Sequence, residues 1–410
     1  MNRIALPANL SLRQFVRHLM RYFSGSQNIG ILLLIFVFMG LQFFMLDRPY
    51  SLLGDEIYYV PEAKSILNHN GLLHPEHPPL GKLFITLGIR LFGDTPFGWR
   101  FFPVLFSSIS ILCLYLTCLR LNLPRWAGLA VAFLFAFENL SFLTGSMATL
   151  DVFMLTFMLA ALLAFLDRKL VLAGLLAGLA ALAKLPGVFV LGVFFLYWLV
   201  LERENWRLII IPVFTSGITF LGLMTLLDFV VAGVWQNPLI TVQNMLSFAA
   251  TLSSDEVFGI SINSEPWEWL VNRGVIFYSY SPQRIALVSY TVLCLVIPAV
   301  IYSIRGSFKK EKQAVIALAW FACTYLSWLV VSLIFHRLMY IWYFYPVVPG
   351  ICLALGYGMQ RFTGMAQDAG NHRLLISVKT GVLLYLLVHL VLFILLSPVG
   401  IPLVKWVYTG

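Results

Sequence analysis

Long apolar stretches separated by short polar segments dominate this chain. A helix needs roughly 17 to 25 mostly apolar residues to cross a bilayer, and about eleven stretches approach this length. Several are short and are expected to extend into flanking residues. The pattern therefore predicts an all-α, polytopic membrane protein. The expected spans are Gly30–Leu46, Gly98–Leu119, Trp126–Phe137, Val152–Leu166, Leu170–Ala183, Val188–Leu201, Leu208–Val231, Ile285–Ile304, Ala314–Phe335, Ile341–Gln360 and Ser377–Leu396.

Composition supports this class of protein. Of 410 residues, 60% are hydrophobic and 11% are charged, whereas roughly a quarter of residues are charged in soluble domains. The five cysteines lie inside apolar runs without metal-ligand spacing, so neither disulfides nor a zinc site is expected.

The distribution of Lys and Arg predicts the orientation in the membrane. If the basic N-terminus is cytoplasmic and the spans alternate, roughly seventeen of the 27 basic residues lie inside, as the positive-inside rule requires. Most carboxylates then lie outside. The net charge of +9 is therefore a topology signal, and no nucleic-acid partner is expected. We expect a multi-pass protein of the plasma (inner) membrane.

Four segments follow from this topology. Residues 1–28, which carry Arg13, Arg17 and Arg21, are expected to form an uncleaved amphipathic helix on the cytoplasmic leaflet. A transmembrane module covers 29–231 and contains a first outer loop, 47–97. The remaining segments are a second outer loop, 232–284, and C-terminal helices, 285–410. In the first loop, Tyr58–Leu67 and Leu83–Phe92 are too short to span and are expected to lie along the interface.

Candidate chemistry is concentrated in the first outer loop, where Asp55-Glu56 is followed by His77-Pro78-Pro79-Leu80-Gly81-Lys82. Polar groups at a membrane face are costly unless they act together. Asp55 is a candidate general base for an attacking hydroxyl. Lys184 and Arg337 lie at outer ends of spans, where each could bind a phosphate or extend to lipid headgroups.

These motifs resemble the protein O-mannosyltransferase family of GT-C glycosyltransferases. The resemblance is strongest over residues 50 to 190 and extends into the second outer loop. It rests on the Asp-Glu pair and the His-Pro-Pro-Leu-Gly-Lys segment, on Gly98-Trp99-Arg100, Glu138-Asn139, Leu150-Asp151 and Lys184, on Ser264-Glu265-Pro266-Trp267-Glu268-Trp269, and on Arg337 with the aromatic run Tyr340–Tyr345.

The resemblance implies an inverting transferase. It would move a sugar, mannose in this family, from a polyprenyl-phosphate donor to an acceptor hydroxyl, a Ser or Thr of a protein, on the outer membrane face. Asp55 matches the catalytic base, and Glu56 would position the acceptor or hold the local charge. Arg100, Lys184 and Arg337 match basic residues near the donor phosphate.

Other polar residues are assigned supporting roles. His77 and Lys82 belong to the motif. Glu138 and Asp151 are expected to brace the outer loops through hydrogen bonds and ion pairs. Trp267 could stack on a sugar or acceptor, although aromatic residues are common at membrane interfaces in any case.

Some of the same residues could bind a metal ion. Asp55, Glu56, His77 and Glu138 offer oxygen and imidazole ligands, so a divalent cation is an open alternative. Basic residues can neutralise the single phosphate of a monophosphate carrier, however. We therefore expect metal-independent transfer and no cofactor.

Two departures from the family pattern keep other functions open. The segment Gly145–Thr149 lacks an expected arginine, and Leu185 rather than Trp follows Lys184. One alternative is transfer of an aminoarabinose-like sugar to a lipid or surface glycan. Another is a lipid-linked sugar transporter, which would need charges through the bilayer midplane, whereas here they gather at one face.

Overall fold

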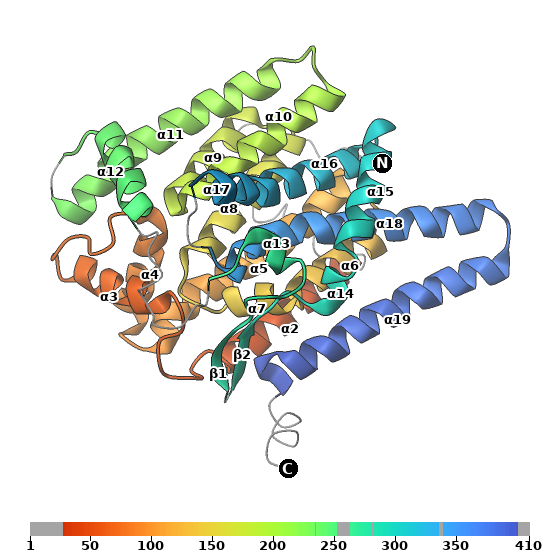
Figure 1. Cartoon of the computed structure of the whole chain (residues 1–410), viewed down its shortest axis with the longest axis horizontal. Coiled ribbons are helices and arrows are strands. Elements are labelled where there is room, and N and C mark those ends of the chain that lie inside the picture. Colours follow the sequence, from red (N-terminus) through yellow and green to blue (C-terminus); the bar gives the residue numbers. More distant parts are fainter. Residues whose placement is uncertain (1–27, 234, 252–262, 281, 336–338, 401–410) are drawn as a thin grey trace.

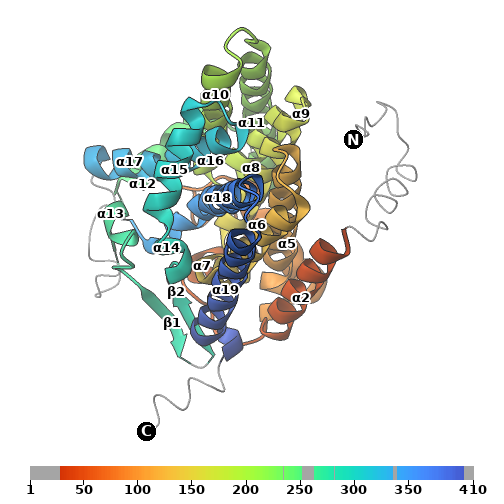
Figure 2. The ribbon, with the colours of Figure 1, turned by 90° about the vertical axis from the view of Figure 1, so that its right-hand side faces the viewer.

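The computed structural model describes residues 28–233, 235–251, 263–280, 282–335 and 339–400. The expected N-terminal amphipathic helix lies almost entirely outside these residues. Helices make up nearly all of the described chain, with one small hairpin of strands at an end of the bundle (Figure 1). The helix α2 and the long α19 lie at the periphery, while α8 and the first half of α18 are enclosed (Figure 2).

The helices are α2 (Ile29–Phe44), α3 (Glu56–Leu67), α4 (Pro79–Phe92), α5 (Pro96–Arg120), α6 (Arg125–Ala136), α7 (Asn139–Thr144), α8 (Leu150–Leu166), α9 (Leu170–Ala183), α10 (Phe189–Leu201), α11 (Arg207–Ala232), α12 (Pro238–Thr251), α13 (Pro266–Trp269), α14 (Tyr290–Leu293), α15 (Val296–Phe308), α16 (Lys312–Phe321), α17 (Ser327–Phe335), α18 (Val348–Asp368) and α19 (His372–Leu396). The 3₁₀ segments are η2 (Leu185–Val188), η5 (Ile341–Val347) and η6 (Pro398–Gly400), and a π-helical turn, η4 (Ala322–Leu326), joins α16 to α17.

Each expected span falls on an apolar helix. Five helical stretches in the described chain are long and apolar enough to cross a membrane by length and composition: Pro96–Arg120, Arg207–Val231, Lys312–Ile334, Ile341–Asp368 and His372–Leu396. The other expected spans fall on shorter apolar helices. The chain is therefore a multi-pass membrane protein, and the number of crossings stays a prediction.

The short helices of the first outer loop, α3 and α4, form where they were predicted, each starting a few residues earlier. Two other boundaries differ from expectation. The span predicted from Ile285 begins instead with a strand and the one-turn α14, and α15 starts only at Val296. The span predicted from Ile341 opens as the 3₁₀ segment η5, which contains Pro346. Proline has no N–H for the helical ladder, which explains the irregular start.

A two-stranded hairpin in the second outer loop was not predicted. Strands β1 (Ile276–Tyr280) and β2 (Gln283–Ala286) pair antiparallel, with Ile276 opposite Ala286 and an irregularity between Phe277 and Ser279. The aromatic composition of β1 suits a strand, but the short run lies in a polar loop where hydropathy gives no signal. The hairpin lies beside α7 at the lower edge of Figure 1.

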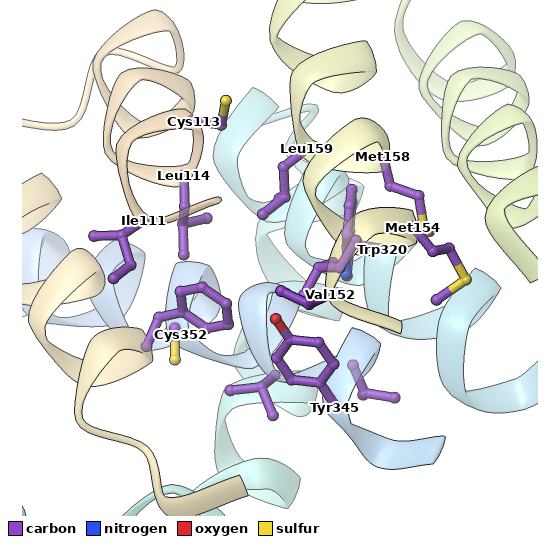
Figure 3. Packing of buried hydrophobic residues seen from close by; sticks show 14 of the residues in the cluster. Ile111, Cys113, Leu114, Val152, Met154, Met158, Leu159, Trp320, Tyr345 and Cys352 are labelled. Atoms are coloured by element: carbon purple, nitrogen blue, oxygen red, sulfur yellow. The ribbon is translucent and has the colours of Figure 1, made fainter. Parts of the chain in front are cut away.

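The core is centred on α8. Leu155 and Met158 of this helix are fully buried, and α8 packs against α5 and α9. Figure 3 shows part of this core, with Val152 and Leu159 of α8 among the labelled side chains. A helix that is apolar all round is expected to be enclosed by others. The buried α8 thus fixes the positions of its neighbours, and its first turn carries Asp151.

Glycines let α9 and α11 approach closely. A Cβ on Gly174 would lie 1.7 Å from the Thr215 hydroxyl, and one on Gly178 would lie 2.7 Å from Cβ of Thr219. Small residues commonly allow such backbone contact between membrane helices. Gly174 and Gly178 lie four residues apart on one face of α9, so both meet α11.

Gly178→Val should therefore destabilise the protein. Overpacking of this kind costs about 1–3 kcal/mol, so we expect a lower midpoint of thermal unfolding in detergent. The matched control is Gly217→Val on α11, where an added Cβ would meet no atom within 4 Å. Equal midpoints for the two variants would contradict the assigned contact.

Candidate active site

The turn before α3 directs two neighbouring carboxylates to different environments. Gly54 has a φ of +48°, a left-handed conformation that glycine adopts readily, and a Cβ there would lie 2.8 Å from the Tyr278 ring. Asp55 is the N-cap residue of α3, and Glu56 begins the helix. Glu56 is fully buried, whereas Asp55 is partly exposed and lines a small cavity.

Glu56 is held by a bidentate ion pair with Arg100 of α5. The Nε–Oε1 distance is 2.8 Å and the Nη2–Oε2 distance is 2.7 Å, with both side chains inaccessible to water. The Glu56 oxygens also accept the backbone N–H groups of Leu53 at 2.9 Å and Ala148 at 2.8 Å. The remaining guanidinium hydrogens go to backbone carbonyls of Leu46, Pro49 and Ser51.

This ion pair is therefore completely satisfied. A guanidinium has five N–H donors, and five hydrogen bonds hold Arg100. A buried ion pair is tolerated when such additional bonds complete it. The pair joins α3 and α5 to the segment after α2 and to the turn before α8.

Asp55 has a different environment. Its carboxylate has no hydrogen-bond partner within the described part of the chain, and it lies in the wall of the cavity. Burial raises the pKa of Asp55 to about 6. The positive charge of Lys184 opposes this shift, and the negative charge of Asp151 adds to it. The cavity is lined by Asp55, Leu140, Leu143, Thr144, Met147, Thr149, Asp151, Tyr278, Ala286 and Trp342.

A buried lysine and aspartate lie beside this cavity. Lys184, at the end of α9, donates to both carboxylate oxygens of Asp151, at 2.9 and 2.8 Å. The ammonium also lies 5.3 Å from the ring centroid of Tyr343. Burial alone would lower the pKa of Lys184, but the charges of Asp151, Tyr343 and Asp55 and the hydrogen bond to Asp151 together outweigh it and raise the pKa. Lys184 is therefore a permanent cation beside Asp55.

Lys82 of α4 does not line the cavity that contains Asp55. Its ammonium lies 2.9 Å from Glu62 of α3 and also donates to the carbonyl of His74, and both charged side chains are fully buried. Pro79 occupies the first turn of α4, where its missing N–H costs nothing. His77 is partly buried against Tyr59, with 5.9 Å between ring centroids. This motif therefore builds the junction between α3 and α4.

Glu138 joins α7 to the segment before α14. It is the N-cap residue of α7, and its oxygens accept the N–H groups of Ser141 at 2.7 Å and Ser289 at 2.8 Å. Trp267 lies on α13 with 49% of its surface exposed and does not line the cavity. Arg337 lies outside the described residues.

The structure thus places Asp55 and Asp151 in the wall of one cavity. Lys184 is bonded to Asp151, and Glu56, beside Asp55 in the chain, is paired with Arg100. The structure does not bring Lys82, Glu138 or Trp267 to the cavity wall. Within the described ranges, no three His, Cys, Asp or Glu side chains are grouped so that they could hold a metal ion.

Arg284 of β2 is part of the site architecture that the sequence did not reveal. Its side chain is buried and donates to the carbonyls of Met45 and Arg48 and to the hydroxyl of Ser146, at 2.7, 2.9 and 3.0 Å. It therefore ties the hairpin to both segments that surround the Glu56–Arg100 pair. The only feature of the sequence that could have indicated burial of Arg284 was the apolar run Ile285–Val288 directly after it.

A family model of dolichyl-phosphate-mannose-protein mannosyltransferases matches residues 76–235. A polyprenol-phosphate-mannose–protein mannosyltransferase of Mycobacterium tuberculosis is 32% identical over 113 residues, which cover 26% of this chain and 22% of that relative. The chain thus spans about a fifth of that relative's length. The enzyme of the same name from Corynebacterium glutamicum is 24% identical over 86% of both chains.

Solved structures show the same architecture. The Saccharomyces cerevisiae protein O-mannosyltransferase Pmt1-Pmt2 complex, bound to the sugar donor, matches with a TM-score of 0.72 and 12% identity over 91% of this chain and 90% of that one. ArnT from Cupriavidus metallidurans, bound to undecaprenyl phosphate, gives a TM-score of 0.54 and 18% identity over 91% and 76%. These likenesses confirm the expected polytopic GT-C fold.

Replacing Arg284 should destabilise the site. Arg284→Met removes the hydrogen bonds to the Arg48 carbonyl and the Ser146 hydroxyl and leaves the Met45 carbonyl with only the N–H of Arg48. The cost is about 1–3 kcal/mol, so the thermal midpoint in detergent should fall. Arg273→Met is the control, because Arg273 lies in the same outer loop but is exposed. A midpoint unchanged from that of the unmodified protein would show that the Arg284 contacts do not support the fold.

Proposed function

We propose that this chain belongs to the protein O-mannosyltransferase family of GT-C glycosyltransferases and transfers mannose from a polyprenyl-phosphate donor to a Ser or Thr hydroxyl of a protein. The transfer takes place at the extracytoplasmic face of the plasma membrane. The observation that carries the proposal is the cavity at which the Asp55 carboxylate, free of hydrogen bonds to the described residues, lies beside the buried cation Lys184.

The reaction needs a base on one side of the sugar and a cation on the other. The acceptor oxygen attacks the anomeric carbon while its proton passes to Asp55. The bond between that carbon and the phosphate oxygen breaks, and the electron pair leaves with polyprenyl phosphate. Attack opposite the leaving group inverts the anomeric configuration. A carboxylate with a pKa near 6 remains ionised at neutral pH and is more basic than an ordinary aspartate.

Lys184 is suited to stabilise the leaving phosphate. A lysine ammonium has three N–H donors, and the two hydrogen bonds to Asp151 leave one for the donor. Asp151 holds the ammonium in position without entering the reaction. Charge stabilisation by a preorganised group in a water-excluded site is a large contribution to catalysis.

Glu56 and Arg100 act as positioning residues in this proposal. Both oxygens of Glu56 and all five donors of Arg100 are already engaged within the protein. Arg100 therefore does not contact the donor phosphate itself. It supports donor binding by holding Glu56, which fixes the turn that carries Asp55. Arg337 is proposed as a second phosphate contact, and Trp267 as a residue of the acceptor side.

Catalysis is proposed to be independent of a metal ion, because Lys184 supplies the positive charge that a single phosphate requires.

The aminoarabinose-like alternative differs in sugar and acceptor and uses the same base and cation. The transporter alternative is less favoured, because Asp55, Lys184 and Asp151 gather at one cavity.

Asp55→Asn should abolish most activity while leaving the fold intact. Asparagine keeps the size of the side chain but cannot accept the proton, and loss of a general base costs roughly 10²-fold or more in turnover. The measurement is mannosyl transfer to an acceptor peptide by purified protein. The control is Asp47→Asn, which changes an exposed aspartate at the start of the same loop. Near-normal turnover by the Asp55 variant would remove the assignment.

The pH dependence of transfer should show the Asp55 carboxylate. Because burial raises the pKa of Asp55 to about 6, the ionised base is lost as the pH falls through 6. The rate of the unmodified protein should then decline about tenfold per pH unit below that value. The residual activity of Asp55→Asn should lack this decline. A decline centred near pH 4, or one that persists in the variant, would assign the base elsewhere.

A further inference from the structure

A second, larger cavity lies far from the Asp55 site, between α15, α18 and α19. It has a volume of about 530 Å³, within the range of about 300–1,000 Å³ typical of ligand pockets. Its wall is formed by apolar and aromatic side chains. Among them are Pro298 and Tyr302 of α15, Leu355 and Phe362 of α18, and Val378 and Tyr385 of α19.

Glycines keep this groove open. Gly358 of α18 and Gly381 of α19 both line it, and a Cβ at either position would meet no atom within 4 Å. Gly356, two residues earlier on α18, differs, because a Cβ there would lie 2.2 Å from the Val131 side chain. The two lining glycines therefore face empty space rather than a packed helix. Leucine would fill that space without backbone strain.

The groove has a basic end. Phe362 and Val378 mark its end near the α18–α19 connection, which projects from the body of the bundle in Figure 1. Two acidic residues, Glu311 and Asp368, lie there, and Glu311 is 3.4 Å from Arg361. The basic residues of this end are Arg305, Lys309, Lys310, Lys312, Arg361, Arg373 and Lys379.

Several of these cations have no ion-pair partner among the described residues. Arg305, Arg373 and Lys379 are exposed and form no ion pair within the described part of the chain. They also lie on the membrane face opposite the Asp55 cavity. The helix α18 begins directly after η5, whose Trp342 lines that cavity, and Arg361 and the connection lie at its other end.

We propose that this groove is a binding site for an anionic phospholipid of the bilayer. One acyl chain occupies the space beside Gly358 and Gly381, and the phosphate-containing headgroup contacts Arg373 and Lys379. Basic pockets between transmembrane helices on one face of the membrane bind anionic headgroups in this way. The site is separate from the proposed mannosyl transfer.

The charges distinguish this occupant from others. A helix of a second copy of the chain would fill the apolar groove but would leave the unpaired cations without a partner. A zwitterionic phospholipid would fill the same space without the net charge that they attract. Polyprenyl phosphate is also anionic, but its proposed reaction site is at the opposite face.

The experiment is native mass spectrometry of the purified chain in detergent. It is titrated separately with phosphatidylglycerol, with phosphatidylcholine of the same acyl chains, and with polyprenyl phosphate. The unmodified protein should bind phosphatidylglycerol about tenfold more tightly than phosphatidylcholine. Arg373→Ala with Lys379→Ala should remove this preference, and Gly358→Leu with Gly381→Leu should remove the tightly bound lipid.

The control is Lys169→Ala with Arg203→Ala. Both residues are exposed, lie at the same membrane face and are absent from the groove, so the preference should be retained. Four results would overturn the proposal: equal affinities for the two phospholipids, a preference that survives loss of Arg373 and Lys379, an equal loss in the control, or displacement of phosphatidylglycerol by polyprenyl phosphate. A dimer that only the glycine variant disrupts, with lipid binding unchanged, would identify a second copy as the occupant.

Discussion

A carboxylate and a guanidinium that are removed from water need a hydrogen-bond partner for every polar atom, and Glu56 and Arg100 meet this requirement. Their ion pair receives backbone N–H groups from Leu53 and Ala148 and distributes the other guanidinium hydrogens to three carbonyls. Removing one partner of such a pair typically costs about 3–5 kcal/mol. The pair thus fixes the turn before α3 relative to α5 and to the turn that opens α8, and the proposed reaction depends on that alignment.

Adjacent residues of similar chemistry acquire different roles from this arrangement. Glu56 is saturated by fixed donors, whereas Asp55 lies in the cavity wall with its pKa raised to about 6. Lys184 is held as a cation by Asp151 from a neighbouring helix. In the proposed mechanism the base and the phosphate-stabilising cation are therefore both in position before substrate binds, and little reorganisation is needed during transfer.

Hydrophobic patterning predicted most of the fold because lipid exposure and burial both favour apolar helices. The spans and the short helices α3 and α4 followed from local sequence. The hairpin and Arg284 did not, because their partners are distant in the chain. Arg284 bonds Ser146 and Arg48, which lie 138 and 236 positions away, and nothing near Arg284 in the sequence identifies them.

The same limit applied to the motif residues. The resemblance marked Asp55, Glu56, Lys82 and Arg100 as a group, but sequence alone could not separate the residue that faces the cavity from those that support it. The partner of Lys82 is Glu62, on the neighbouring helix α3, and this pairing depends on how α3 packs on α4. The site residues could thus be named from sequence, and their division of labour required coordinates.

Transfer in detergent by the purified protein tests the central claim most directly. The protein is supplied with polyprenyl-phosphate mannose and a Ser/Thr peptide, and mannosylated peptide and free polyprenyl phosphate are quantified with and without EDTA. With Asp55 as base and Lys184 as the phosphate-stabilising cation, the two products should form in equal amounts, with inverted configuration and no loss in EDTA. Absence of mannosylated peptide, or activity that EDTA removes and a divalent cation restores, would contradict this account.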